Sequence, residues 1–241
     1  MGKQDKIFEE GNVSGLPFSF NLEVTEVFED MIDRSVPGYN TTLRIIQQQT
    51  KNHYIKGTNI YDLGCSLGAS TSSLLNALNG KSKVIAIDNS ESMVRACKER
   101  FSKYIKAEQV NFLKEDISHS EIVNASIVVI NFVLQFLSIK ERAELMQKIY
   151  QGLVPGGILI LSEKIHFDSK KRTDEISCIH HSFKAANGYS KLEISSKRDS
   201  LEGVLVTETE FQHLDRAKEL GFKSSTKLMS NLNFLTYMFQ K

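Results

Sequence analysis

The sequence predicts an α/β fold in which a mostly parallel sheet carries helices on both faces and ends in an antiparallel hairpin. From residue 59 onward, short apolar runs alternate with longer helical patterns, which is typical of successive βαβ units. The run 127–130 is apolar throughout, as expected of a strand that is covered on both sides. The last two predicted strands, 223–230 and 233–239, are joined by only a short polar link, so they must pair antiparallel.

The individual elements follow from apolar spacing and from residues that begin or end helices. Strands are expected over 59–63, 83–87, 109–113, 125–131, 157–161, 223–230 and 233–239, which makes a seven-stranded sheet. Helices are expected over 24–34, 41–53, 69–78, 90–104, 139–153 and 208–220. Ser90 can cap the fourth helix, Pro37-Gly38 separates the first two, and Gly221 ends the last.

Two segments fall outside the alternating pattern. Residues 1–56 form a predicted N-terminal helical arm, and residues 164–207 form a long polar insertion after the fifth strand. Ligands of open α/β sheets bind beyond the carboxyl ends of the strands. We therefore expect the insertion to form a lid over that edge or a dimer contact. No internal repeat or linker is evident, and a single domain is expected over residues 1–241.

Composition excludes several classes of protein. The chain has 30 Lys and Arg against 29 Asp and Glu, for a net charge of +1, which argues against a surface that binds nucleic acid or membrane over its whole extent. Three cysteines at no motif spacing predict no disulfide framework and favour the cytoplasm. No apolar run approaches the length of a membrane span, and the N-terminus lacks the apolar core of a signal peptide.

Glycine or polar residues stand at the ends of four successive predicted strands. Gly64 and Gly68 follow the first strand and permit a sharp turn with close approach to a ligand. Asp88 ends the second strand, about 20 residues later, where an acid can accept hydrogen bonds from ribose hydroxyls. Asp116 follows the third strand and Asn131 ends the fourth. The series predicts a nucleotide site at the carboxyl edge of the sheet.

Each of these features also has a purely structural interpretation. Asp62 and Asp88 could be turn formers at strand ends, and Asp116 could be a helix cap. Pro155-Gly156-Gly157 is more typical of a turn that enters a strand. Cys65 is more typical of a buried packing residue than of a nucleophile. The recurrence at four strand ends favours the nucleotide site.

Two other enzyme classes fit parts of the pattern. The segment Gly64–Gly68 matches the G-x-S-x-G nucleophile elbow of α/β-hydrolases, and Asp174 with His180 or His181 could formally complete a triad. That elbow comes after several strands in hydrolases, whereas here it follows the first clear strand and an acid ends the next. Hydrolysis is therefore disfavoured. A dinucleotide dehydrogenase is disfavoured because the chain has no G-x-G-x-x-G.

The strand-end residues resemble those of the class I S-adenosylmethionine-dependent methyltransferases, which have a Rossmann-like fold. In that class the loop after the first strand holds the methionine part of the cofactor. The second-strand acid holds the ribose, and the third-strand Asp with its neighbour holds the adenine. The Pro155-Gly156-Gly157 turn and the terminal hairpin also match, whereas Ser66 stands where most members have glycine.

Four motifs resemble a narrower family within this class, the carboxy-S-adenosylmethionine synthases. They are Met31–Tyr39, Tyr61–Ala69, Asn131–Phe136 and Ala186–Ser195, and the likeness extends from Phe18 to Gly221. It implies conversion of S-adenosylmethionine and prephenate to carboxy-S-adenosylmethionine and phenylpyruvate. It further implies that a separate tRNA carboxymethyltransferase uses the product to modify wobble uridine. A homodimer is also implied, because the family is dimeric. The balanced charge separately predicts no direct contact with nucleic acid, the residue pattern predicts no metal, and the cysteines favour a cytoplasmic location.

The resemblance carries over a set of site residues by motif. The residues expected to line the nucleotide site are Tyr39, Gly64, Cys65, Ser66, Asp88, Asn89, Asp116, Ile117, Asn131 and Arg198. Arg198 and Tyr39 are also expected as catalytic residues at the new carboxylate, because a guanidinium pairs bidentately with a carboxylate and a phenol can donate to it. The insertion that carries Arg198 is expected near the dimer interface.

The implied reaction requires a closed, dry site more than a protein base. Prephenate can lose carbon dioxide and hydroxide together as its ring becomes aromatic. The hydroxide can take a proton from the sulfonium methyl group, whose protons are acidic, and the resulting carbanion can trap the carbon dioxide.

Other conspicuous residues and functions remain as alternatives. The segment 178–181, Cys-Ile-His-His, could suggest a metal, but adjacent histidines point different ways on a helix and no carboxylate-rich partner set is evident. The segment 170–172, Lys-Lys-Arg, is more typical of a solvated face, with attraction of prephenate as the alternative. Phe132, Phe136 and Tyr150 are expected in the core. Two alternative functions remain. One is an ordinary methyltransferase that acts on a small molecule or RNA, and the other is a nucleotide-binding protein without catalysis.

Overall fold

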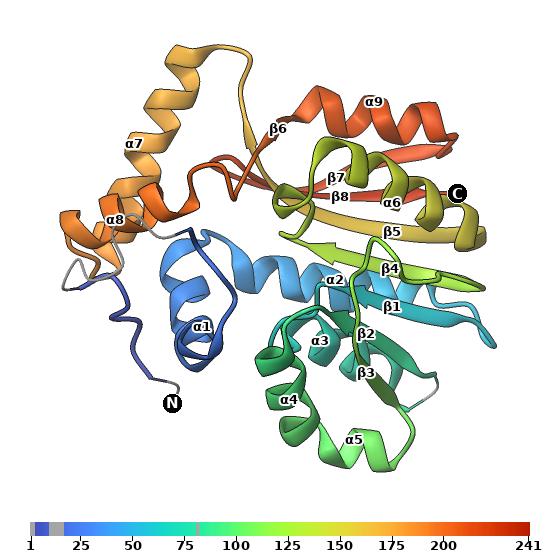
Figure 1. Ribbon diagram of the computed structural model, residues 1–241. Helices are drawn as coiled ribbons and strands as arrows, with labels where there is room; N and C mark the ends of the chain where they lie inside the picture. Colours follow the sequence, from blue (N-terminus) through green and yellow to red (C-terminus); the bar gives the residue numbers. More distant parts are fainter. Residues whose placement is uncertain (1–2, 10–16, 81) are drawn as a thin grey trace.

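The computed structural model describes residues 3–9, 17–80 and 82–241, and a twisted sheet runs through its centre. The strands are β1 (Asn59–Leu63), β2 (Val84–Asp88), β3 (Val110–Lys114), β4 (Ala125–Asn131), β5 (Leu153–His166), β6 (Glu208–Thr209), β7 (Ser224–Asn231) and β8 (Phe234–Gln240). They lie in the order β3-β2-β1-β4-β5-β8-β7, with β6 paired to β5 (Figure 1). The first five strands pair parallel, and β8 pairs antiparallel with both neighbours. The predicted fold class is confirmed.

Helices cover both faces of this sheet. They are α1 (Leu22–Ser35), α2 (Tyr39–His53), α3 (Ala69–Leu78), α4 (Glu91–Arg100), α5 (Ser102–Lys106), α6 (Ile139–Gly152), α7 (Lys170–Ala186), α8 (Lys191–Leu201) and α9 (Glu210–Leu220), with a 3-10 turn η1 (Leu134–Phe136). Alternate residues of β4 enter two separate cores. Ile127 and Val129 pack in the core with residues of α2, α3 and α4, and Val128 and Ile130 pack in the core with residues of α6 and α9.

Some predicted boundaries were wrong. The helix expected over 90–104 is interrupted at Phe101, which ends α4 and precedes α5. The fifth strand extends well beyond 157–161, because β4, β6 and β8 all supply backbone partners along it. The two-residue β6 also brings the sheet to eight strands rather than seven.

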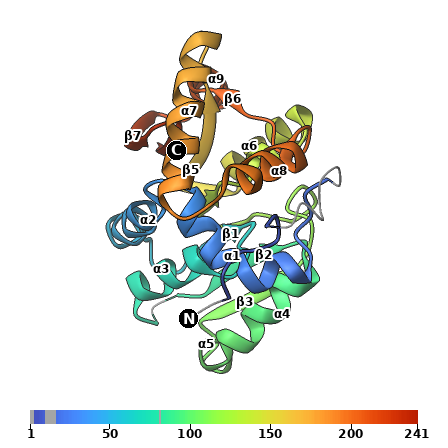
Figure 2. The ribbon, with the colours of Figure 1, turned by 90° about the vertical axis from the view of Figure 1, so that its left-hand side faces the viewer.

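Helix α1 of the arm and the insertion lie at the carboxyl edge of the sheet, whereas α2 packs on one face of the sheet beside α3. The polar segment 164–207 contains α7 and α8, whose first turns are capped by Ser169 and Ser190. In Figures 1 and 2, α1, α7 and α8 gather beyond one end of the strands. Within the described ranges, no helix is long and apolar enough to cross a membrane.

Candidate functional site

A cavity of about 400 Å³ lies where the carboxyl ends of β1 to β4 meet α1, α7 and α8. The predicted site residues that line it are Tyr39, Gly64, Cys65, Ser66, Asp88, Asn89, Asp116, Ile117 and Asn131. Arg198 does not line it in the single chain. Its side chain is 64% exposed, and its guanidinium lies 2.9 Å from the carboxylate of Asp199.

The loop after β1 requires glycine because it passes close to its neighbours. Gly64 has a φ of +75°, and an added β carbon would lie 2.5 Å from a methyl carbon of Val133. Gly68 has a φ of +77°, and an added β carbon there would lie 2.6 Å from the ring of Phe101. Ser66 adopts a φ of +48°, a left-handed conformation that glycine adopts more readily. The turn therefore brings backbone groups to the wall of the cavity.

Asp88 is fixed at the end of β2 by two backbone donors. Its carboxylate accepts the N–H of Ser66 at 2.8 Å and the N–H of Ser90 at 2.9 Å. Burial raises the pKa of Asp88, and these two hydrogen bonds act in the opposite direction. A carboxylate has further lone pairs beyond those used here, so Asp88 can still accept hydrogen bonds from ribose hydroxyls.

Asn131 and Tyr39 each bring to the cavity wall a polar group that has no partner among the described residues. The side-chain amide of Asn131 donates to Ser70 Oγ at 3.1 Å, whereas its buried Oδ1 has no partner among the described residues. The Tyr39 hydroxyl makes no hydrogen bond within the described part of the chain. Burial raises the pKa of Tyr39 above its ordinary range, and the charges of Asp62 and Glu29 add to this. Because unpaired buried acceptors are rare, the Oδ1 atom of Asn131 is suited to a ligand that brings a hydrogen-bond donor.

Cys65, Asp62 and Asp116 make contacts within the protein that agree with their structural interpretations as a packing residue, a turn former and a cap. Cys65 is 4% exposed, and its contact with Cys97 together with burial raises the pKa of its thiol well above the usual value. Asp62 accepts the hydroxyl of Thr71 at 2.5 Å, and burial raises its pKa to about 7. Asp116 accepts the N–H of Ser118 at 2.8 Å while it also lines the cavity.

The residues of a hydrolase triad are not brought together. The Ser66 hydroxyl lies 3.5 Å from the sulfur of Met93. Asp174 pairs with Lys170 along the exposed side of α7, and Lys171 pairs with Glu175 in the same way. His180 is instead buried, with its ring nitrogen donating to the Ser35 carbonyl at 2.7 Å. This α7 surface is a solvated face of paired charges.

The structure brings no metal-binding set together in the part of the chain that it describes. Cys178 is exposed, whereas His180 is buried. No group of three or more His, Cys, Asp or Glu side chains that could hold a metal occurs among the described residues.

Several cavity residues were missed by the sequence analysis. They are Phe18, Phe20, Phe132, Gln135, Phe136, Lys164, His180, Lys184 and Lys197. Phe132 is buried, as expected of a core residue, and Phe136 is partly buried, but both also border the cavity. Lys164 could have been predicted from the sequence. It lies near the carboxyl end of β5 once that strand is extended to His166, and residues at the carboxyl ends of the strands are expected to line the site. Lys184 and Lys197 lie on insertion helices, and their spacing gave no local signal.

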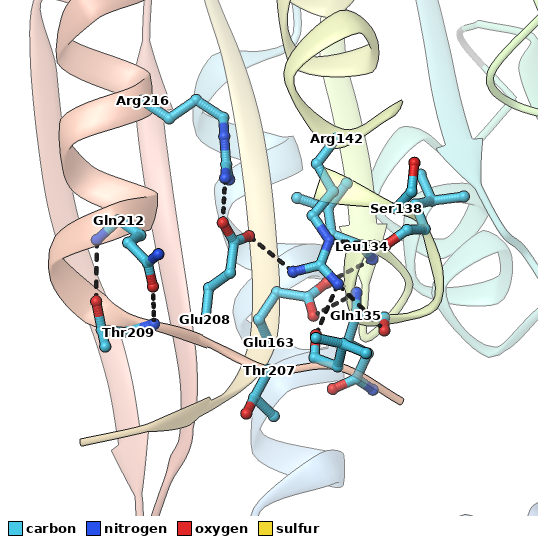
Figure 3. Close-up of polar contacts among 12 residues, drawn as sticks. Leu134, Gln135, Ser138, Arg142, Glu163, Thr207, Glu208, Thr209, Gln212 and Arg216 are labelled. Carbon is cyan, nitrogen blue, oxygen red and sulfur yellow. Dashed lines mark hydrogen bonds and ion pairs between the residues drawn. The ribbon is translucent and has the colours of Figure 1, made fainter. Parts of the chain in front are cut away.

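A buried acid holds the segment that follows β4. Glu163 on β5 is 3% exposed, and its carboxyl oxygens accept the N–H groups of Val133, Leu134 and Gln135 at 3.1, 2.8 and 3.2 Å. Burial raises the pKa of Glu163 to about 8. Figure 3 shows this carboxyl group beneath the η1 turn. Glu163 therefore positions the segment that carries Phe132 and Gln135 along the cavity.

An ion-pair network next to Glu163 joins α6 to the end of the insertion, and its Arg142 also donates to the carbonyl of Gln135 in η1 at 3.4 Å. Arg142 is 1% exposed and donates to Glu208 at 2.9 Å and to the carbonyl of Val206 at 2.7 Å. Glu208 also pairs with Arg216 of α9 (Figure 3). The network joins α6, β6 and α9 and anchors the chain where it leaves the insertion.

The sheet order and the cavity at its carboxyl edge define a class I methyltransferase fold. Residues 60–157 match the family model described as a methyltransferase domain. A putative O-methyltransferase from Nostoc punctiforme aligns with a TM-score of 0.65 at 13% identity, covering 98% of this chain and 69% of that one. Human N-acetylserotonin methyltransferase, solved in complex with S-adenosylmethionine, aligns with a TM-score of 0.60 at 16% identity, covering 91% and 55% of the two chains.

Curated relatives identify the family within this class. The chain is 44% identical over 231 residues to carboxy-S-adenosyl-L-methionine synthase of Shewanella halifaxensis, covering 95% of each chain. It is 46% identical over 221 residues to the synthase of Hydrogenovibrio crunogenus, covering 92% of this chain and 88% of that one. The protein belongs to the carboxy-S-adenosyl-L-methionine synthase family. It is an S-adenosylmethionine-dependent transferase.

Proposed function

We propose that the protein converts S-adenosylmethionine and prephenate to carboxy-S-adenosylmethionine and phenylpyruvate. The observation that carries this proposal is the 44% identity to a synthase of that name over 95% of both chains. The geometry supports it, because the nucleotide residues and a separate basic region line one cavity. A cavity shared by two ligands suits a transfer between them.

In the proposed reaction, the protein binds the two substrates and excludes water from them. The β1 loop and Asn131 hold the methionine part of the sulfonium substrate, Asp88 its ribose, and Asp116 with Ile117 its adenine. Prephenate loses carbon dioxide and hydroxide as its ring becomes aromatic. The hydroxide removes a proton from the sulfonium methyl group, giving water, and the carbanion forms a new C–C bond to carbon dioxide. Tyr39 offers its hydroxyl to the carboxylate that results.

Arg198 requires a second subunit for its expected role. Its side chain faces solvent in the single chain, yet the product differs from the substrate by one carboxylate that a guanidinium is suited to bind. We infer that the protein forms a homodimer in which the insertion of one subunit brings Arg198 to the cavity of the other. The product then passes to a separate tRNA carboxymethyltransferase in the cytoplasm, a compartment that suits the three free cysteines.

Mass spectrometry of the reaction tests the proposal. Purified protein incubated with S-adenosylmethionine and prephenate should yield a nucleoside heavier than S-adenosylmethionine by one carboxyl group, together with phenylpyruvate in equal amount. Omission of prephenate should abolish both products. Methylation of an added acceptor without consumption of prephenate would indicate an ordinary methyltransferase, and cofactor binding without turnover would indicate a binding protein.

A further inference from the structure

Three lysines gather on one side of the cavity. Lys164 comes from β5, Lys184 from α7 and Lys197 from α8, and all three line the cavity. Lys184 and Lys197 are only 8% and 6% exposed. The acids that line the same cavity, Asp88 and Asp116, stand at the ends of β2 and β3. The cavity therefore has an acidic region at the nucleotide residues and a basic region beneath the insertion.

The lysines differ in their protein partners. The ammonium of Lys197 lies 3.7 Å from the carboxylate of Asp5 and donates to Ser35 Oγ at 3.2 Å. Lys164 and Lys184 have no carboxylate within ion-pair distance and no side-chain hydrogen bond among the described residues. The ammonium of Lys164 lies 5.9 Å from the ring centre of Phe234. Two cations, the buried Lys184 and the partly buried Lys164, thus line the cavity without a protein anion among the described residues.

Burial without an anion is unfavourable for both ammonium groups. Burial lowers the pKa of Lys184 to about 7, and the charges of Lys197 and Lys164 add to this effect. Burial also lowers the pKa of Lys164. Burial lowers the pKa of the neighbouring His180 to about 3, so its imidazole is neutral. An anion bound between the lysines would relieve both burial and mutual repulsion.

We propose that Lys164 and Lys184 form a subsite for the carboxylate that stays on the carboxyl donor throughout the reaction. This inference rests on the proposed function, in which prephenate carries one carboxylate that is transferred and a second that remains on phenylpyruvate. A cation against the transferred group would stabilise it before the C–C bond breaks and oppose its loss as neutral carbon dioxide. A cation against the retained carboxylate binds equally before and after that step. The lysine pair therefore positions the donor without slowing decarboxylation.

Lysine-to-methionine variants test this assignment. Lys164→Met and Lys184→Met remove the charge and keep an unbranched apolar stem, so the packing is largely retained. Lys191→Met is the matched control, because Lys191 is exposed at the start of α8 and lies outside the cavity. Three quantities are measured for each variant: affinity for S-adenosylmethionine, KM for prephenate, and affinity for phenylpyruvate at saturating S-adenosylmethionine.

Both cavity variants should lose affinity for prephenate and for phenylpyruvate by similar factors, about 30-fold or more. Affinity for S-adenosylmethionine should stay within about twofold of wild type, which also shows that the variants are folded. Loss of S-adenosylmethionine binding would mean that the lysines hold its methionine carboxylate and would overturn the proposal. Weaker prephenate binding with unchanged phenylpyruvate binding would assign them to the transferred carboxylate and also overturn it.

The wild-type enzyme separates this inference from the function on which it rests. If wild type forms no carboxylated product from prephenate, the proposed function fails and this inference fails with it. If wild type forms the product and both lysine variants bind the two keto acids as well as Lys191→Met does, only the subsite is wrong.

Discussion

At the scale of a single residue, Asp88 combines a structural role with a position on the cavity wall. Its carboxylate fixes the β1 loop through Ser66 and the start of α4 through Ser90. The same group lines the cavity. The turn-forming and ligand-binding interpretations of this residue are thus compatible, because one carboxylate can accept several hydrogen bonds.

Removal of this carboxylate should weaken binding of S-adenosylmethionine. Asp88→Ala is expected to cost about 1.5–3 kcal/mol, the range for hydrogen bonds to a charged group, measured by calorimetric titration. Glu91→Ala is the control, because it removes a nearby surface acid whose side chain is 74% exposed. An affinity of Asp88→Ala within about twofold of wild type would contradict a ribose contact.

His213 should make the stability depend on pH. It is 3% exposed on α9, and neither ring nitrogen has a partner among the described residues. Burial lowers its pKa to about 4, with the charges of Arg216 and Arg142 contributing and Glu208 opposing. Between pH 6.5 and 4 the unfolded chain binds a proton that the folded chain does not. The contribution of His213 to the free energy of unfolding is therefore fully present above pH 6.5 and is lost as the pH falls from 6.5 to 4.

His213→Gln should remove this dependence. The loss of unfolding free energy between pH 7.5 and pH 5 should be smaller in the variant than in wild type by about 2 kcal/mol, measured by urea unfolding. His119→Gln, at an exposed position, should leave the wild-type dependence intact. Parallel curves for wild type and His213→Gln would show that the buried imidazole does not control acid stability.

At the scale of elements, the β1 loop and the segment after β4 depend on each other. Gly64 leaves no room for a β carbon beside Val133, and the backbone of Val133 is held from the other direction by Glu163. The two segments therefore pack as a unit at the cavity wall, and a change in either should affect both.

A pair of glycine variants separates this packing from backbone strain. Gly57 and Gly64 both have left-handed φ angles, but an added β carbon at Gly57 would meet nothing within 4 Å. Gly57→Ala should cost about 1–2 kcal/mol of stability from conformation alone. Gly64→Ala should cost about 1–3 kcal/mol more because it overpacks against Val133, and it should also weaken binding of S-adenosylmethionine. If urea unfolding gave the same loss of unfolding free energy for Gly57→Ala and Gly64→Ala, the segment after β4 would be shown to move aside for the added β carbon at no cost.

At the scale of the whole molecule, a single chain does not bring Arg198 to its own cavity. The cavity is bounded by the sheet edge, α1, α7 and α8, but the exposed Arg198 points elsewhere. The homodimer proposed above supplies the missing cation from a second insertion.

Mixing of two variants that are each impaired at a different residue of the site tests this arrangement, at concentrations of S-adenosylmethionine that do not saturate Asp88→Ala. Arg198→Ala should weaken binding of the carboxylated product by about 2–5 kcal/mol and change S-adenosylmethionine binding little, with Arg198→Lys recovering only part. Reassembled dimers of Arg198→Ala and Asp88→Ala should regain activity, because one site then receives Arg198 from the other subunit and keeps its own Asp88. Persistent inactivity of verified mixed dimers would place Arg198 in its own site, and a monomer by light scattering would exclude the arrangement.

The sequence by itself determined the parts of the protein that depend on local pattern. Alternating apolar runs predicted the parallel sheet and its antiparallel end, because burial on one or two faces dictates the spacing of apolar residues. The strand-end rule located the cavity residues from Gly64 to Asn131, because parallel strands present their carboxyl ends at a common edge. The family likeness came from the same segments.

Only the tertiary structure decided which distant side chains share a space. Nothing in the local sequence of Lys184 or Lys197 indicates that α7 and α8 turn these lysines toward Lys164 on β5. The extent of β5 was likewise set by the partners on either side of it. Whether a lysine has an anionic partner depends on which residues surround it in the folded protein. The basic side of the cavity could therefore be recognised only from the position of the insertion over the sheet.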